Sequence, residues 1–427
     1  MKTMEESGYV DGYTDEESGE TGVEIYGRDV IYLNGKVTSK TPLLTAAQDF
    51  AGAINELFQS GSGGGDEDWI FPEHWLDIPD PEPNQVILYV EAESAGYGFV
   101  VQFYSNSDTD YTRSGVVEWG DGASSAVVST AELSASNFRI CHKYTDAGQY
   151  IVKINCNRGE TGGYAVRLTN TYGNDADSGD LVNSLNLGWV KAVKVGSEVE
   201  VCASSDESVD GTNYAAFNTF SNLMYVKFIG APSYCYFANL RYLKKIEFGG
   251  DITKLPFSAF SGCHNLERAD FTGKITEFPR YAFNACHNLK SVDLSSAITI
   301  GIRAFSSCES LKNISITAVT TISDYAFSYC YALTNIKAPA LTEIQNKYAF
   351  SYCHNLKTFE APLLTTMNSE SFSYCYGLKT FNAPMLAEIA VTEFTGCYAL
   401  EELTLAADCN YNGNTFSNCQ LLYPKPQ

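Results

Sequence analysis

A single pattern of hydrophobic and polar positions recurs through the second half of the chain. Phenylalanine is followed three residues later by cysteine, and three residues after that by leucine. The phenylalanines are spaced 22 or 23 residues apart, at Phe260, Phe283, Phe305, Phe327, Phe350, Phe372, Phe394 and Phe416. A fixed period in the low twenties is typical of a leucine-rich-repeat solenoid, because each unit buries its apolar side only by stacking on the next.

Each repeat divides into three parts, as the copy AFSYCYALTNIKAPALTEI at residues 326–344 illustrates. It predicts a turn or short helical segment, then a strand at residues 333–338, then a return segment. Because side chains alternate along a strand, we expect Asn335 and Lys337 on the concave face. The positions expected inside, in ladders that run between repeats, are Ala326, Phe327, Cys330, Leu333, Ile336, Ala338, Leu341 and Ile344.

The cysteine of the repeat is interpreted as a small interior residue. In two degenerate earlier copies the same slot holds Phe220 and Leu240, so the position accepts different apolar side chains. Cysteines stacked in register have Cβ atoms about 4.8 Å apart, whereas a disulfide needs about 3.8 Å. The chain also has 13 cysteines, an odd number. We therefore predict a ladder of free thiols.

These repeats resemble the BspA-type leucine-rich repeat, whose usual form is AFxxCxxLxxIxxPxxLxxI, over residues 210–423. The resemblance implies a solenoid, α/β or β-rich, of about ten repeats. We assign it to a domain at residues 186–427. The resemblance also implies a role in adhesion and recognition rather than catalysis.

Alternating β-type runs between residues 84 and 185 predict a small β-sandwich. Two phrases within it are VEWGDG at residues 117–122 and HKYTDAGQYIV at residues 142–152. Together they resemble the polycystic-kidney-disease-type (PKD-type) immunoglobulin-like module, over residues 84–170. The resemblance implies a spacer or binding module, in which His142 makes a turn hydrogen bond rather than acting in catalysis.

The first 83 residues predict an anchor and a linker. Residues 60–83 predict a linker in two parts. Residues 60–68 are glycine-rich and indicate a flexible segment, and residues 69–83 are proline-rich and indicate an extended one. Residues 1–59 predict a small α+β anchor, with short strands around the turn Asn34-Gly35 and one helix. Apolar residues on that helix step by four and three as in an assembly seam: Leu43, Ala47, Phe50, Ile54 and Leu57. Alternatively, the helix packs on the strands as a single amphipathic element.

The helix phrase TAAQDFAGAINEL resembles a segment common in tail and fibre proteins of bacteriophages. An anchor, a linker, an immunoglobulin-like module and a solenoid also make a modular fibre plan. The N-terminal sequence MKTMEESGYVDGYTDEESGE has no apolar run, so no secretory signal is expected. This combination favours a protein that is assembled in the host cytoplasm and carried on a virion.

The net charge of −23 limits the classes of partner that the protein is expected to bind. Nucleic acid and anionic lipid both select clustered Lys and Arg, so neither is expected as a partner. No apolar run is long enough to span a bilayer, so we expect no membrane insertion.

The sequence contains none of the catalytic or cofactor-binding motifs considered below. It has no phosphate-binding glycine loop and no GxSxG motif, so we expect neither an enzyme nor a cofactor. His264, His287 and His354 share the phrase CHNL and are interpreted as solvated residues rather than metal ligands. Residues 170–180 are acidic but lack EF-hand spacing, which favours a solvated loop over a calcium site.

Tyrosines that flank the repeat cysteines form the candidate recognition surface. Their apolar faces and polar tips suit glycans and protein partners. Alternatively, the rings cover the solenoid edge and stack on one another. The candidate residues are Tyr329, Tyr331, Tyr352, Tyr374, Tyr376 and Tyr398.

These observations lead to one main hypothesis of function. The protein is a structural virion protein, a tail or head fibre, that attaches to other virion proteins by its N-terminus. Its repeats then recognise a host-surface glycan or protein, and the chain assembles as a homo-oligomer, a trimer or dimer. The alternative is a bacterial cell-surface adhesin built of the same modules. A glycan-active enzyme would need a carboxylate pair in a cleft, which the sequence does not indicate.

Overall fold

The computed structural model describes most of residues 70–422 and three short strands between residues 11 and 32. Within residues 70–422 the segments not described are 106–113, 129–137, 158–163, 170–186, 203–219, 221, 232–236, 346, 390–391, 412–414, 417 and 420. The chain divides into two units, Met1–Asp68 and Trp69–Gln427.

The first unit contains an antiparallel sheet of three strands, β1 (Asp11–Thr14), β2 (Thr21–Ile25) and β3 (Arg28–Tyr32). Strand β2 ends at Ile25 and β3 begins at Arg28, so both strands lie ahead of the predicted turn. The predicted turn Asn34-Gly35, the predicted seam (Leu43, Ala47, Phe50, Ile54 and Leu57) and residues 60–68 of the predicted linker lie outside the described residues. The α+β anchor therefore stays a prediction.

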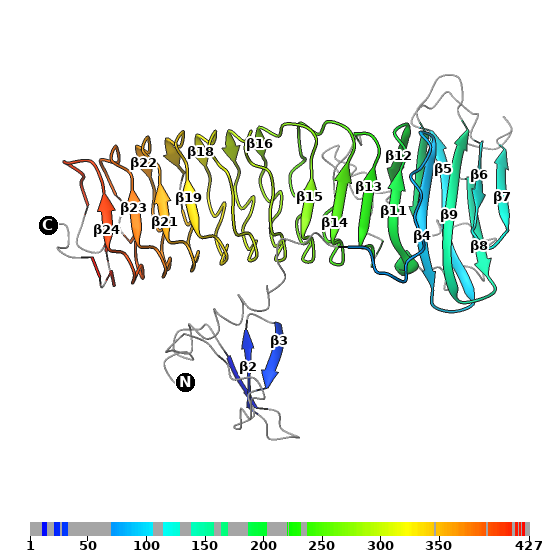
Figure 1. The fold of residues 1–427 in the computed structure, drawn as a ribbon, viewed down its shortest axis with the longest axis horizontal. Helices are drawn as coiled ribbons and strands as arrows, with labels where there is room; N and C mark the ends of the chain where they lie inside the picture. The colour runs from blue at the N-terminus through cyan, green and yellow to red at the C-terminus, as the bar shows by residue number, and fades with distance from the viewer. Residues whose placement is uncertain are drawn as a thin grey trace. The chain divides into compact units, whose positions relative to one another are not determined.

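The second unit begins with strands that lie in two sheets (Figure 1). The sheet of four strands has the order β12-β10-β5-β8, and the sheet of eight has the order β15-β14-β13-β11-β4-β9-β6-β7. The strands are β4 (Gln85–Ala92), β5 (Gly96–Ser105), β6 (Ser114–Glu118), β7 (Ser124–Val128), β8 (Phe138–Tyr144), β9 (Gly148–Asn157), β10 (Tyr164–Thr169), β11 (Val190–Val195), β12 (Val199–Cys202), β13 (Tyr225–Phe228), β14 (Lys245–Phe248) and β15 (Arg268–Asp270).

Strand β11 joins the two regions that the sequence analysis separated. It pairs antiparallel with β4 and parallel with β13, the first described strand of the repeats. One sheet therefore runs from β7 into the solenoid, and the predicted boundary between residues 185 and 186 does not separate two compact units. The core of this region includes Trp119 and Tyr144, both fully buried. The immunoglobulin-like character of the region stays a prediction.

The proline-rich part of the predicted linker packs on this sheet. The ring of Trp75 lies 4.7 Å from that of Tyr89 on β4, and Ile78 is buried. The carboxylate of Asp80 pairs with Lys194 at 3.0 Å and Lys227 at 2.9 Å. The proline-rich segment is therefore packed against the sheet, because its apolar and charged side chains have partners on β4, β11 and β13.

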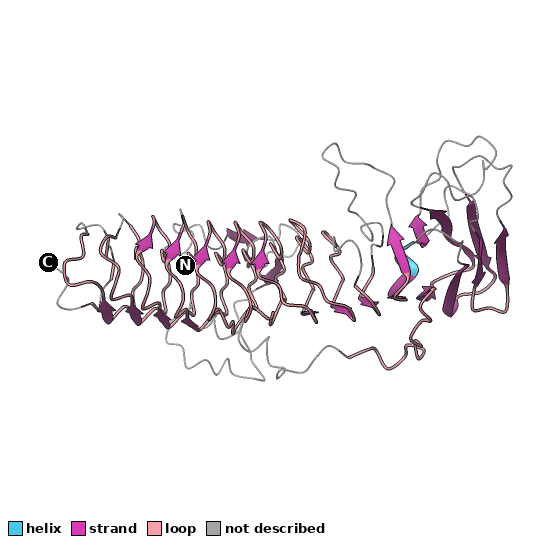
Figure 2. Cartoon of the chain, turned by 90° about the horizontal axis from the view of Figure 1, so that it is seen from above, coloured by secondary structure: helices cyan, strands magenta, loops and turns pink. Residues whose placement is uncertain are grey.

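The repeats that follow form two parallel sheets along the solenoid, visible as two rows of strands in Figure 2. One row has the order β16-β17-β18-β20-β22 and the other β19-β21-β23-β24. Their bounds are β16 (Glu277–Phe278), β17 (Thr299–Ile300), β18 (Thr321–Ile322), β19 (Asn335–Lys337), β20 (Glu343–Ile344), β21 (Thr358–Glu360), β22 (Thr366–Met367), β23 (Thr380–Asn382) and β24 (Glu402–Thr404).

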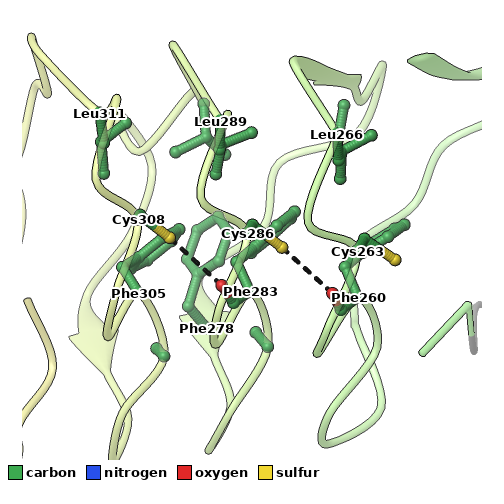
Figure 3. Packing of buried hydrophobic residues seen from close by; sticks show 14 of the residues in the cluster. Phe260, Cys263, Leu266, Phe278, Phe283, Cys286, Leu289, Phe305, Cys308 and Leu311 are labelled. Carbon is green, nitrogen blue, oxygen red and sulfur yellow. Dashed lines mark hydrogen bonds between the residues drawn. The ribbon is translucent and has the colours of Figure 1, made fainter. Parts of the chain in front are cut away.

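The interior of the solenoid confirms the predicted ladders. Every position predicted inside the copy at residues 326–344 is fully buried, and Asn335 and Lys337 are exposed. Phenylalanine rings stack from repeat to repeat, as between Phe283 and Phe305, whose centroids lie 5.4 Å apart. Figure 3 shows the Phe, Cys and Leu rows of three successive repeats. Because each row continues into the next coil, no repeat buries its apolar side alone.

The segment between the two rows of strands is a turn, not a helix. Around Phe327 it carries left-handed backbone at Tyr325 and Tyr329, with φ of 53° and 60°. The N–H groups of Tyr325, Phe327 and Tyr329 donate to carbonyls of the following repeat over 2.8–3.0 Å. A helix would use these donors within its own segment. The solenoid is therefore β-rich rather than α/β, and the described residues contain one 3₁₀ helix, η1 (Leu187–Trp189).

Candidate functional site

Two columns of aromatic rings run along one edge of the solenoid. The first column follows the residue directly before each repeat cysteine. Its rings at Tyr329, Tyr352 and Tyr374 stack face to face, with centroids 4.6 and 4.8 Å apart. Because the repeat brings the same position to the same place in every coil, the turn geometry sets the ring spacing.

The second column follows the residue directly after each repeat cysteine. It consists of Tyr331, His354, Tyr376 and Tyr398, with successive centroid distances of 4.8, 4.6 and 5.4 Å. The single histidine does not interrupt the stack of tyrosines, since both kinds of ring are planar and aromatic. The column contains one ring that the sequence analysis left out of the surface, His354.

The columns meet edge to face. Tyr329 and Tyr331 lie 6.3 Å apart at 88°, and Tyr374 and Tyr376 lie 6.3 Å apart at 85°. Such T-shaped pairs place the positive edge of one ring on the negative face of another, and each stabilises the packing by about 0.5–1.5 kcal/mol. We call these seven rings together the aromatic surface.

Left-handed backbone fixes the first column. Tyr329, Tyr352 and Tyr374 have φ of 60–61°, a conformation that is unfavourable for residues other than glycine. Each of them donates its N–H to a carbonyl of the next repeat, over 3.0, 2.9 and 2.7 Å. These inter-repeat hydrogen bonds hold the strained backbone and with it the direction of each ring.

All six predicted tyrosines lie in the aromatic surface. Five are half-buried, and Tyr398 is 42% exposed. The rings do stack on one another, as the structural alternative expected. Their role in recognition stays a prediction.

His354 is held neutral by its place in the column. Burial between Tyr331 and Tyr376 lowers the pKa of its imidazole to about 4. The interpretation of His354 as a solvated residue is therefore wrong. The stacked position of His354 could have been predicted from the sequence, because His354 directly follows a repeat cysteine, as Tyr331 and Tyr376 do. His264 and His287 occupy the same position in two earlier repeats, and their ring centroids lie 4.9 Å apart. The Nδ1 atom of His287 lies 2.9 Å from a carboxylate oxygen of Glu309.

The repeat cysteines that the structure describes are free thiols, as predicted. Besides filling the apolar interior, they donate hydrogen bonds. Each thiol donates to the carbonyl of the phenylalanine in the preceding repeat, as Cys330 does to Phe305 over 3.1 Å. Full burial raises the pKa of the Cys330 thiol well above its usual value. Such thiols are poor nucleophiles and poor metal ligands. The described residues hold no group of three or more His, Cys, Asp or Glu side chains suited to a metal ion.

His142 has the structural role expected of it. Its Nε2 lies 2.6 Å from a carboxylate oxygen of Asp121, and its ring stacks on the buried Trp119. Gly120 and Gly122 on either side of Asp121 have φ of 87° and 91°, so the GDG turn depends on glycine. The predicted solvated loop at residues 170–180 lies outside the described residues.

Comparisons with known proteins identify the repeats. Residues 213–333 and 320–424 match the family of BspA-type leucine-rich-repeat regions. This part of the chain is therefore a solenoid of BspA-type leucine-rich repeats, as predicted. No curated protein matches the chain. In the part of the chain that the structure describes, no helix has the length and apolar character needed to span a bilayer.

Solved structures with similarity to the chain are also leucine-rich-repeat proteins. One is the leucine-rich-repeat protein of T. pallidum, 18% identical, TM-score 0.30, covering 61% of this chain and 84% of that one. A second is a leucine-rich cell surface protein from Faecalibacterium prausnitzii, 18% identical, TM-score 0.27, covering 55% and 88%. A third, from Bacteroides ovatus, is 19% identical, TM-score 0.27, covering 62% and 78%. These descriptions apply to those proteins.

Proposed function

We propose that this protein is an adhesin-like recognition protein, whose repeats bind a partner on another surface. The observation that carries the proposal is the aromatic surface, a row of rigid, partly exposed rings repeated over successive coils. Rigid tyrosines lose little conformational entropy on binding, which makes them effective contact residues. The BspA-type repeats that carry the rings imply the same role.

We place the protein on the bacterial cell surface, the alternative of the sequence analysis, ahead of the virion. The virion hypothesis depends on the phrase TAAQDFAGAINEL, which lies outside the described residues. The repeats, by contrast, are identified, and their resemblance implies adhesion. In either setting we propose that the chain is not an enzyme and that the N-terminal unit serves attachment and self-assembly.

The proposal is tested by binding of the fluorescently labelled full chain to a panel of bacterial and animal cells, read by flow cytometry. We expect saturable binding to at least one cell type. The triple substitution Y331S/Y376S/Y398S should weaken it at least about tenfold, because it removes three rings of one column. A matched control is Y242S, since Tyr242 is 53% exposed but lies outside the aromatic surface. Binding to no cell type, or equal binding by the triple variant, overturns the proposal.

A further inference from the structure

We propose that the aromatic surface binds an uncharged polysaccharide chain that lies along the stack of repeats and is held by the hydroxyl-bearing edges of the rings. The inference rests on the proposed function and names its ligand. Three observations support it: both faces of the inner rings are occupied, the segments that carry the rings contain no Asp, Glu, Lys or Arg, and the rings repeat at a regular spacing.

Both faces of each inner ring are occupied by other rings. His354 lies between Tyr331 and Tyr376 in its column, and Tyr352 lies between Tyr329 and Tyr374 in the other. The accessible part of a half-buried ring stacked on both faces is its edge. On tyrosine that edge carries the hydroxyl, which both donates and accepts hydrogen bonds. This arrangement selects ligands that hydrogen-bond rather than ligands that stack.

Occupied faces also argue against a cationic ligand. A cation binds an aromatic ring over its face, where the negative part of the quadrupole lies. Both faces of the inner rings Tyr352, His354 and Tyr376 are covered by neighbouring rings at 4.6–5.4 Å, and each ring at the end of a column is covered on one face. The segments that carry the rings, YCYA at residues 329–332, YCHN at 352–355 and YCYG at 374–377, contain no carboxylate either.

The segments that carry the rings offer no counter-charge to an anionic ligand. Those three segments contain no Lys or Arg, and His354 is neutral near pH 7 because its pKa is lowered to about 4. The whole chain carries a net charge of −23, which repels anions at long range. A charged group desolvated here without a partner would lose binding free energy. The ligand that fits is uncharged.

The spacing of the rings selects an extended ligand. Four rings of the second column follow one another at 4.6–5.4 Å, one per repeat. Three of them are tyrosines, so hydroxyl groups recur in a line along the solenoid. A polymer of uncharged sugars also presents hydroxyl groups repeatedly along its length. Each hydrogen bond adds a modest contribution, and several in a line add up to specific binding.

The test is native affinity electrophoresis of the full chain in gels that contain one polysaccharide each. The uncharged probes are dextran, mannan, galactan and xyloglucan, and the anionic probe is alginate. We expect retardation in at least one uncharged gel and none in alginate. Y331F/Y376F/Y398F keeps the stacked rings and removes only hydroxyls, so the fold persists. We expect it to weaken the retarding affinity at least about tenfold.

The control is Y242F, which removes an exposed hydroxyl outside the aromatic surface and should leave retardation unchanged. Three results overturn the inference: no retardation in any uncharged gel, retardation in alginate equal to that in the uncharged gels, or full retardation of the triple Phe variant. If the labelled chain binds cells through the aromatic surface but these gels give one of those results, the ligand is of another class, such as a protein, and the proposed function stands. If the gels give the expected result but no cell type is bound, the proposed function fails by itself.

Discussion

At the scale of single residues, the repeat cysteine combines two properties. It is small enough for a tightly packed interior, and its thiol donates to the phenylalanine carbonyl of the preceding repeat. That carbonyl also accepts a backbone N–H within its own repeat, as Phe305 does from Cys308 at 3.2 Å. Apolar character was predictable, because Phe220 and Leu240 share the slot. The hydrogen bond was not, because the position of the acceptor depends on the left-handed turn.

The first prediction concerns this hydrogen bond. Cys330→Ala removes both the donor and the buried volume of the sulfur, so we expect the free energy of unfolding to fall by about 1–2 kcal/mol. Urea unfolding of the full chain followed by circular dichroism measures the change. Cys409→Ala is the control, because Cys409 is only partly buried and should give a much smaller effect. Equal stability of wild type and Cys330→Ala would contradict this account of the slot.

A second residue-scale prediction concerns Glu393, which occupies a slot that is alanine in most repeats, such as Ala326 and Ala349. Its side chain is fully buried. One carboxyl oxygen accepts the N–H of Ser371 at 2.7 Å, and the other has no hydrogen-bond partner in the described part of the chain. Burial, together with the nearby carboxylate of Glu370, raises the pKa of Glu393 to about 8.

The raised pKa fixes the sign of a pH effect. Between the usual glutamate pKa of 4.5 and about 8, the unfolded chain ionises Glu393 while the folded chain keeps it protonated. The free energy of unfolding therefore falls by up to about 1.4 kcal/mol per pH unit across that window. Glu393→Ala should remove this slope, so its stability relative to wild type should rise from about pH 5 to about pH 8. Urea midpoints that change in parallel for both proteins would rule out a protonated Glu393.

At the scale of elements, the turn segment is what sequence reasoning predicted least well. The strands and the interior ladders followed from periodicity, since burial and β-pairing share one 22-residue register. The turn carries Tyr, Ser, Arg and Ala at positive φ, residues whose own preferences do not indicate left-handed backbone. Hydrogen bonds to the next repeat impose that conformation, and they form only after stacking. Because these hydrogen bonds depend on stacking, the sequence of a single repeat could not distinguish a turn from a short helical segment.

The element-scale prediction uses Ser307, which has φ of 60° in the slot where Gly262 and Gly396 have φ of 76° and 78°. Ser307→Gly should leave the free energy of unfolding unchanged to within about 0.5 kcal/mol, because relief of strain offsets the added chain entropy. Ser307→Val should lower it by about 2 kcal/mol, since a β-branched side chain is strained at this φ. The control, Ser315→Val, lies on an exposed position and should be nearly neutral. Equal effects of Gly and Val at residue 307 would refute a left-handed requirement.

At the scale of the second unit, the sheet through β4, β11 and β13 closes the first coil of the solenoid. Solenoids need terminal caps, because an uncovered end exposes apolar surface and unpaired strand groups. Here β4 supplies a strand whose residues Val86 to Val90 are all fully or nearly fully buried. The sequence indicated both parts separately but not this junction. Antiparallel pairing between segments a hundred residues apart leaves no local signal.

Truncation tests the capping role. A chain beginning at residue 186 keeps every predicted repeat but loses β4, so it should expose the edge of β11 and aggregate or lose cooperative unfolding. A chain beginning at residue 69 keeps the whole second unit and should unfold cooperatively, as the full chain does. Light scattering and thermal melts followed by circular dichroism distinguish the two. A soluble, cooperative chain from residue 186 would show that the repeats need no such cap.

The central claim is that the aromatic surface is where this protein meets its partner. The most direct measurement is the cell-binding isotherm of the labelled full chain, compared between wild type, Y331S/Y376S/Y398S and Y242S. We expect the triple variant to lose at least about tenfold in affinity and Y242S to match wild type, because the loss of central contact residues has the largest effect on binding free energy. Equal isotherms for all three proteins, with folding confirmed by circular dichroism, would contradict it.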